Sequence, residues 1–311
     1  MIDVFVKINN NVVKGNLDNI KKRGVSWVDV VNPTTKELQS LSDHSGISLY
    51  DLNEHLVPNE RPNTFEFNKY SMMVFACPGK NHKPTTVAIY ILGNNNVISV
   101  HKKELNPLNL MKQELEKKNV SYFDSGVKII RVLLEKMVNE YFNIFEVIQE
   151  EADNVETRAF HNPDRKLMKE IFGIKKKVMH LHKSLTANRE VMVQIEKEYL
   201  TKISRKEIYE LKDIRNDLNQ LIDISELVRE LVTSVIDVYQ SSVSNQMNTV
   251  IKKLTVAASY VLIPTLIASI YGMNFRSMPE FAWKYGYPFA IAIMGLSIIA
   301  MYVYFKKSHW L

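Results

Sequence analysis

Apolar and polar residues follow two different rhythms along this chain, one before and one after residue 125. In the first part, short apolar stretches bounded by turn residues predict β-strands. These strands cover Ile2–Ile8, Trp27–Val30, Phe65–Ala76, Thr86–Leu92 and Val97–His101, with Asn94-Asn95-Asn96 as a hairpin turn. Helices are expected from Thr34, which fits a capping box with Glu37, and over Leu49–Leu56 and Asn106–Lys118. This mixture predicts an α/β or α+β domain over residues 1–125.

From residue 126 to 253 the apolar residues recur every three or four positions, which predicts long amphipathic helices. The first carries Ile130, Leu133, Leu134, Met137, Tyr141, Ile144, Phe145 and Ile148, and a second follows Asn162-Pro163. A third begins near Ile208. Because neither Pro nor Gly occurs between Gly173 and Pro264, this third helix can continue into the apolar region beyond residue 253. It is expected to be roughly 60 residues, or about 90 Å, long.

Two stretches near the end of the chain lack Asp, Glu, Lys and Arg altogether. They span residues 254–275 and 285–305. A bilayer core needs about 20 apolar residues of helix, so each stretch is long enough to cross it. Aromatic residues at their ends suit the membrane interface. The alternative is a buried helical hairpin of a soluble protein, although two such adjacent stretches are rare in soluble folds.

The charges around these stretches predict their orientation. Lysines lie on the terminal side of both, whereas the connecting loop holds Arg276, Lys284 and the opposing Glu280. The lysines are Lys252, Lys253, Lys306 and Lys307. Positive-inside counting places both termini in the cytoplasm and the loop outside. The first residues, MIDVFVKINNN, do not resemble a signal peptide. We therefore expect a multi-pass protein of the cell (inner or plasma) membrane.

Composition narrows the function classes. A single cysteine, Cys77, excludes a disulfide scaffold and a Cys-based zinc site. The sequence has neither GxxxxGK[ST] nor GxGxxG, so no nucleotide cofactor is expected. The net charge of +6 does not favour nucleic-acid binding, because the excess lysines flank the apolar stretches or lie in one helix balanced by an acidic one. An enzyme is also not expected, since no His, Cys or carboxylate set suggests catalysis.

One face of the first apolar stretch carries small and hydroxyl residues at helical spacing. The face reads Asn248, Ile251, Thr255, Ala258, Leu262, Thr265 and Ser269. Such a face permits close helix packing or lines water, and spacing alone favours neither. A two-span chain cannot enclose a pore alone, so a pore would require a ring of copies.

Tyr271-Gly272-Met273-Asn274-Phe275 ends this stretch, and here the sequence resembles the CorA family of magnesium transport proteins. That family carries Gly-Met-Asn at the outer end of the first of two C-terminal membrane helices. The similarity extends to Met278-Pro279-Glu280, to Tyr285-Gly286-Tyr287-Pro288, to Ser241–Asn245 and to Tyr304–Lys307. It implies a funnel-shaped homopentamer with an α/β cytoplasmic domain, a long helical stalk and two transmembrane helices.

The resemblance also implies roles for particular residues. Gly272, Met273 and Asn274 would form the selectivity filter, where neutral amide and carbonyl oxygens of Gly272 and Asn274 hold hydrated Mg²⁺ without trapping it. The alternative for Asn274 is a helix cap. The pore-lining residues would be Asn248, Leu254, Ala258, Leu262, Thr265 and Ser269. Leu254 and Leu262 would constrict the pore, and Pro264 leaves its register open by about one residue.

Regulation by cytoplasmic Mg²⁺ is likewise implied by the resemblance. Asp213 falls where the family has a metal-site aspartate, with Asp217 one turn on, although an exposed Asp is usually only solvated. Residues 135–156 are mainly acidic and residues 165–183 mainly basic. The family pairs acidic helix tips with a basic ring, which Lys306 and Lys307 would supply. The alternative is two solvated faces of an antiparallel helix pair.

The resulting prediction is a Mg²⁺ channel or transporter driven by the membrane potential and gated by intracellular Mg²⁺. Transport of Co²⁺, Ni²⁺ or Zn²⁺ and a non-conducting membrane scaffold or sensor are the alternatives. The predicted segments are the α/β domain 1–125, the bundle and stalk 126–253, the pore helix 254–275, the outer loop 276–285 with Glu280, the second span 286–305 and the basic tail 306–311.

Overall fold

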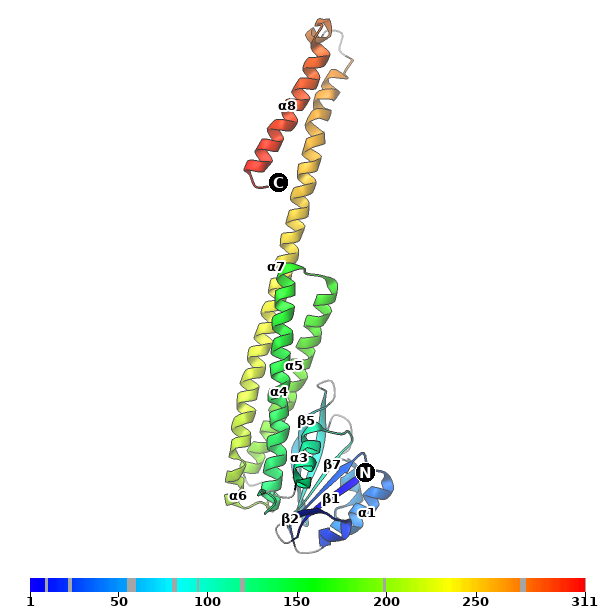
Figure 1. Cartoon of the computed structure of the whole chain (residues 1–311), viewed down its shortest axis with the longest axis vertical. Coiled ribbons are helices and arrows are strands. Elements are labelled where there is room, and N and C mark those ends of the chain that lie inside the picture. Colours follow the sequence, from blue (N-terminus) through cyan, green and yellow to red (C-terminus); the bar gives the residue numbers. More distant parts are fainter. Residues whose placement is uncertain are drawn as a thin grey trace. The chain divides into compact units, whose positions relative to one another are not determined.

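The structure, a computed structural model, describes residues 1–8, 11–21, 24–54, 60–79, 83–93, 95–117, 121–197, 200–274 and 278–310. The chain forms two compact units (Figure 1). One contains Met1–Arg158 and Asp164–Ile236, and the other contains Ala159–Pro163 and Asp237–Leu311.

A seven-stranded sheet forms the centre of the N-terminal part of the first unit. Its order is β2-β1-β3-β7-β6-β5-β4. The strands are β1 (Ile2–Ile8), β2 (Asn11–Lys14), β3 (Ser26–Val31), β4 (Asn63–Glu66), β5 (Tyr70–Pro78), β6 (Pro84–Leu92) and β7 (Asn96–His101). Only β3 and β7 pair in parallel, whereas the other neighbours are antiparallel. The α/β fold expected for this region is therefore present.

Two strand predictions need correction. The single strand expected over Phe65–Ala76 is wrong, because the chain turns at Phe67 and forms the antiparallel pair β4 and β5. The amide of Phe67 donates to the carbonyl of Tyr70 at 2.9 Å and closes that turn. The edge strand β2 was not predicted, since it is short and has a single buried residue, Val12. Of the predicted Asn turn, Asn95 has a positive φ of 65°, and residue 94 lies outside the described residues.

Short helices complete the core of this domain. They are η1 (Leu17–Lys21), α1 (Thr35–Ser45), α2 (Leu49–Glu54) and α3 (Asn106–Glu116). The predicted capping box is confirmed, since Thr34 and Glu37 each accept the backbone N–H of the other. Fully buried apolar residues such as Val28, Leu41 and Ile98 pack between the sheet and the helices η1, α1 and α2. The predicted ends of two helices, Leu56 and Lys118, lie outside the described residues.

Three long helices follow: α4 (Gly126–His161), α5 (Arg165–Glu196) and, after the short α6 (Arg205–Glu210), α7 (Lys212–Tyr271). Helix α7 has 60 residues, as the absence of Pro and Gly predicted. In the first unit α4, α5 and the beginning of α7 lie side by side (Figure 1). Asn188 of α5 anchors the helices to the sheet, because its side chain accepts from the amide of Ala76 and donates to the carbonyl of Ala76, both at 2.8 Å.

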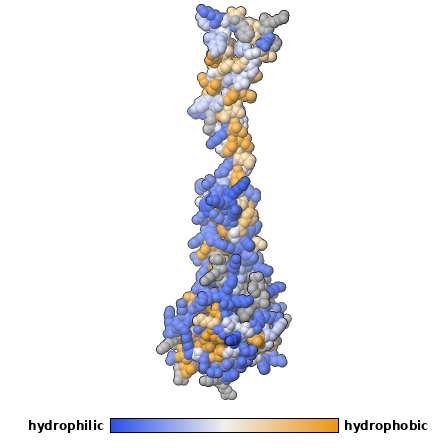
Figure 2. Space-filling view, turned by 90° about the vertical axis from the view of Figure 1, so that its right-hand side faces the viewer, coloured by the Kyte–Doolittle hydropathy of each residue, from blue (hydrophilic) through white to orange (hydrophobic). Residues whose placement is uncertain are grey.

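The second unit contains the end of α7, the short η3 (Pro279–Ala282) and α8 (Gly286–Lys307). By length and composition, α7 and α8 each contain a stretch long and apolar enough to cross a membrane. Hydrophobic residues cover much of the surface of these stretches, whereas the helices of the first unit present a mainly hydrophilic surface (Figure 2). Helix α7 stops at Tyr271, before the predicted end at residue 275, and α8 continues through Lys307, so Lys306 and Lys307 lie in its last turn.

Candidate functional site

The Gly-Met-Asn segment lies immediately after the end of α7. The amide of Gly272 donates to the carbonyl of Ala268 at 2.9 Å, and that of Met273 donates to Ile270 at 3.3 Å. A Cβ on Gly272 would lie 3.2 Å from the Ala268 oxygen, so glycine suits this close approach. Because the backbone of residues 272 and 273 closes the last turn, Asn274 is not the helix cap. Its exposed side chain lies beyond the helix, where its amide oxygen is available to a ligand.

The loop before α8 is held by a close backbone contact. The amide of Trp283 donates to the carbonyl of Glu280 at 3.2 Å, and the amide of Gly286 donates to Trp283 at 3.0 Å. A Cβ on Gly286 would lie only 2.3 Å from the Glu280 oxygen, so this position requires glycine. The Trp283 ring packs edge-on against Phe289 with centroids 5.4 Å apart. The loop carrying Glu280 is thus fixed to the first turn of α8.

Substituting Gly286 with alanine should release this loop. The added methyl group overlaps the Glu280 carbonyl, and relieving such overpacking costs about 1–3 kcal/mol. Hydrogen exchange of the Trp283 and Gly286 amides in the full-length protein should accelerate roughly tenfold or more. Gly295→Ala is the control, because nothing lies within 4 Å of a Cβ placed there. Equal exchange rates in both variants would show that the contact does not hold the loop.

The predicted pore-lining face of α7 points away from α8. Successive residues on a helix are rotated by about 100°, which puts Val256, Tyr260, Ile263 and Ile267 on one side. This side is the less exposed one, and its Tyr260 ring packs edge-on against Phe305 of α8 with centroids 6.2 Å apart. The opposite side holds exposed residues, namely Leu254 and Leu262, each 69 % exposed, with Ala258, Thr265 and Ser269. Asn248, further toward the stalk, is exposed as well.

This arrangement helps to distinguish the two interpretations of the small-residue face, close helix packing and contact with water. Since α8 covers the other side of α7, the small residues do not serve to pack the two spans of one chain together. They remain accessible to other copies or to water. The Thr265 hydroxyl donates to the Val261 carbonyl at 2.6 Å, which leaves its oxygen lone pairs directed outward as acceptors. Pro264 supplies no N–H to the helix, yet α7 continues through it.

The predicted regulatory aspartate lies at the other end of α7. Asp213 is in the first turn and is exposed, whereas Asp217 is partly buried. Burial raises the pKa of Asp217, and the nearby carboxylates of Asp213 and Glu135 raise it further. Glu135 lies on α4, and sequence reasoning missed it because only the packing of α4 against α7 brings it there. Within the described ranges, however, no three His, Cys, Asp or Glu side chains form a group that could hold a metal ion.

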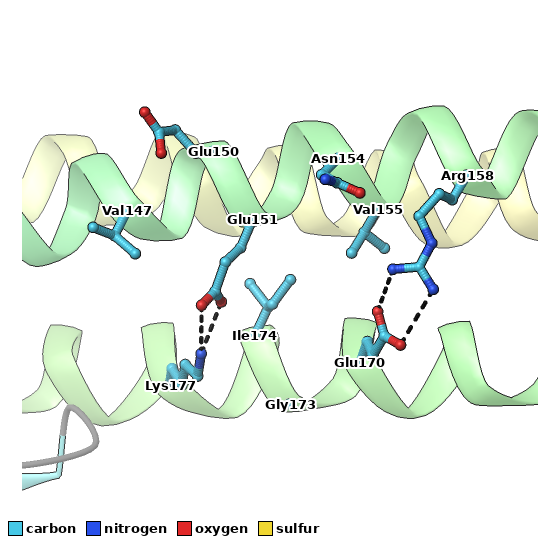
Figure 3. Close-up of a pocket in the computed structure, with 10 residues that line it drawn as sticks. All are labelled: Val147, Glu150, Glu151, Asn154, Val155, Arg158, Glu170, Gly173, Ile174 and Lys177. Carbon is cyan, nitrogen blue, oxygen red and sulfur yellow. Dashed lines mark hydrogen bonds and ion pairs between the residues drawn. The ribbon is translucent and has the colours of Figure 1, made fainter.

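The acidic and basic segments neutralise each other in part across the α4–α5 hairpin. Glu151 accepts two hydrogen bonds from Lys177 at 2.7 and 3.0 Å. Arg158 and Glu170 form a two-armed pair at 2.6 and 3.2 Å. Both pairs bridge the groove between the helices (Figure 3). For these residues this supports the interpretation as two faces of an antiparallel helix pair. Glu150, by contrast, points out of the groove (Figure 3).

A soluble α/β domain, a long helix and two C-terminal apolar helices with an exposed Gly-Met-Asn between them define a two-span membrane protein. The profile of the family described as "CorA-like Mg2+ transporter protein" matches residues 22–307. The chain therefore belongs to this family, as the residues around Gly272 predicted.

Individual relatives and structures agree over nearly the whole chain. The cobalt/magnesium transport protein CorA of Methanocaldococcus jannaschii is 29% identical over 313 residues, covering 99% of each chain. Its namesake from Thermotoga maritima is 28% identical over 298 residues, covering 92% of this chain and 83% of the relative. The complete structure of the CorA magnesium transporter from M. jannaschii superposes with a TM-score of 0.88 at 27% identity, covering 100% of this chain and 99% of that one. The predicted fold is thereby confirmed.

Proposed function

We propose that this protein is a channel through which Mg²⁺ crosses the membrane down its electrochemical gradient. The observation that carries the proposal is the exposed Gly272-Met273-Asn274 segment at the end of a membrane-length helix, in a chain whose family match spans residues 22–307. The relatives named above are magnesium or cobalt/magnesium transport proteins. In this proposal the protein transports an ion and catalyses no chemical reaction.

The pore is formed by several copies. One chain presents the exposed α7 face with Leu254, Ala258 and Leu262 and covers the opposite face with α8. A ring of copies turns the exposed faces toward a common axis, and family resemblance makes the ring a funnel-shaped homopentamer. Leucine rings at 254 and 262 then close the path by excluding water, while Thr265 and Ser269 offer hydroxyl oxygens to a hydrated ion.

The outer mouth selects the ion through neutral oxygens. Mg²⁺ loses its water reluctantly and tends to keep several ligating waters. A ring of Asn274 amide oxygens, with Gly272 carbonyls and the Met273 backbone, hydrogen-bonds those waters. Since the oxygens carry no full charge, the ion is held weakly enough to move on.

The membrane potential drives the flow. With both termini in the cytoplasm and the Glu280 loop outside, a divalent cation entering the cell gains about 4.6 kcal/mol per 100 mV, twice the single-charge value. No nucleotide is required for this step.

Intracellular Mg²⁺ closes the pore by binding near Asp213. In one chain, burial and then the nearby carboxylates of Asp213 and Glu135 raise the pKa of the partly buried Asp217. A cation at this position relieves the repulsion. Because a single chain does not complete a metal site in its described part, a neighbouring copy supplies the remaining ligands.

Asp213→Ala should weaken closure by internal Mg²⁺. Removing one carboxylate from the site should raise the Mg²⁺ concentration for half-closure roughly tenfold or more. The measurement is Mg²⁺ flux into proteoliposomes loaded with increasing internal Mg²⁺. Asp223→Ala, which removes an exposed carboxylate further along α7, is the matched control. Inhibition unchanged by Asp213→Ala would make this residue structural.

The transported ion is tested by the same assay. Fluxes of Mg²⁺, Co²⁺, Ni²⁺ and Zn²⁺ under an imposed potential should be largest for Mg²⁺. Co²⁺ is the second candidate, since two relatives are named cobalt/magnesium transport proteins. Absence of any ion flux would favour a non-conducting scaffold or sensor and would refute the proposed channel.

A further inference from the structure

Four lysines gather at the end of the second unit opposite the Gly-Met-Asn segment. They are Lys252 and Lys253 on α7 and Lys306 and Lys307 on α8. The sequence contains no Asp or Glu between Asp237 and Glu280 and none after Glu280. All four side chains are exposed, and none forms an ion pair with a described residue. Their ammonium groups are therefore accessible to an anion.

The chain after α8 folds into a defined turn, which we call the C-terminal hook (Ser308–Trp310). His309 has a φ of 55°, and its amide donates to the carbonyl of Lys306 at 3.3 Å. The amide of Trp310 donates to the carbonyl of Phe305 at 3.0 Å. These two hydrogen bonds, together with the left-handed conformation of His309, form a Schellman motif. Such a motif usually includes an apolar contact between the residues that its longer hydrogen bond joins, here Phe305 and Trp310. Here Trp310 stacks on Phe305 with ring centroids 5.8 Å apart.

The hook brings the lysine-bearing ends of the two helices together. The Lys252 Nζ lies 5.9 Å from the centroid of the Trp310 ring, a cation–π distance. Phe305 in turn contacts Tyr260 of α7, and Figure 1 shows the C-terminus beside α7. Lys306 lies over the ring of Tyr302 at 5.7 Å. The hook therefore holds the Trp310 indole beside the Lys252 ammonium group, at the end of α8 that carries Lys306.

That end of α8 is where a lipid headgroup would be. The lysines are the first charges beyond the uncharged stretches of α7 and α8, so they lie at the edge of the bilayer core. Tyr304 and Val303, which precede them on α8, are 67% and 57% exposed and offer an apolar surface to acyl chains. Trp and Tyr favour this interface. Clusters of lysines directly beside a membrane helix attract anionic headgroups.

We propose that the C-terminal hook, with Lys252, Lys253, Lys306 and Lys307, is a binding site for an anionic phospholipid. The ammonium groups pair with its phosphate, and the apolar residues of α8 contact its acyl chains. The ligand bridges α7 and α8 where the hook already joins them. This inference rests on α7 and α8 being membrane spans, but not on which ion crosses them.

Native mass spectrometry of the full-length protein, titrated with phosphatidylglycerol and with phosphatidylcholine of the same acyl chains, tests the site. The wild type should retain phosphatidylglycerol preferentially. Each lysine removed should weaken retention roughly fivefold, so Lys252→Gln with Lys306→Gln should weaken it about 25-fold. The double variant Lys169→Gln with Lys176→Gln, which removes two exposed lysines of α5, should leave retention unchanged.

Trp310→Ala tests whether lipid binding needs the hook itself or only the total positive charge of the lysines. It leaves the net charge unaltered but removes the ring that positions Lys252, so retention of phosphatidylglycerol should fall severalfold. Equal retention of the two lipids, or equal loss in the α5 control, would overturn the proposal. Competition by millimolar inorganic phosphate would also overturn it, because it would identify a site for free anions.

Discussion

Asn274→Ala should abolish Mg²⁺ uptake into proteoliposomes while the oligomer remains intact by size-exclusion chromatography. The side chain lies beyond the last turn of α7, which Gly272 and Met273 close through their own amides. Alanine therefore removes no helix cap and should not unfold the helix. What it removes is one amide oxygen per copy from the place where a hydrated ion enters. Without the Asn274 amide oxygens, the remaining backbone carbonyls are too few to hold the waters of the hydrated ion at the mouth.

Two further variants sharpen this experiment. Asn219→Ala removes an exposed amide from the stalk part of α7 and should leave uptake unchanged. Asn274→Asp keeps the size of the side chain but adds a charge. A carboxylate ring should bind Mg²⁺ more tightly and conduct it more slowly, so its uptake should be low but saturate at lower concentration. Wild-type uptake by Asn274→Ala would contradict the assignment of the filter.

The membrane helices could be predicted because their signals are local. Helix α7 depends on an uninterrupted run of residues that tolerate a helix, and the absence of Pro and Gly before Pro264 is visible in the sequence. The uncharged stretches likewise need no knowledge of the fold. The exact ends were less accessible, since α7 stops at Tyr271 where its backbone bonds tighten, within a stretch that remains apolar.

Features that arise from packing between distant segments were missed. In the Phe65–Ala76 stretch apolar residues nearly alternate with Glu66, Asn68 and Ser71 as in one strand, although polar Asn68-Lys69 marks the turn between β4 and β5. Glu135 approaches Asp217 across two helices that are separated by all of α5. The partners of Asp29 could not be predicted either, because nothing in its apolar strand indicates which distant residues contact its carboxylate.

Asp29 is the centre of a buried polar network in the α/β domain. Its side chain is fully buried. One carboxylate oxygen accepts from the Ser99 hydroxyl at 2.5 Å and lies 3.1 Å from Nε2 of His101. The other oxygen is 2.5 Å from the Lys112 Nζ, which also pairs with Asp3 at 2.9 Å. The network thus joins strands β1, β3 and β7 to helix α3.

These contacts determine the charge of Asp29. Burial disfavours the ionised form, but hydrogen bonds and charge from His101 and Lys112 outweigh it and lower the pKa below the ordinary 3.8. Because the folded pKa is the lower one, the stabilisation is complete above pH 3.8. It is lost as the pH falls further, through the folded pKa. Asp29→Asn should remove this part of the acid sensitivity.

Lys112→Met should destabilise the α/β domain strongly. The methionine keeps the apolar length of the side chain but leaves the buried Asp29 carboxylate without its lysine, and breaking a buried pair in this way costs about 3–5 kcal/mol. Guanidinium unfolding, followed by the fluorescence of Trp27 beside Ser99, measures the loss. Lys14→Met is the matched control, because Lys14 pairs with Glu116 at the surface, where both side chains are more than half exposed. Equal stability of the two variants would show that Lys112 does not compensate the buried charge.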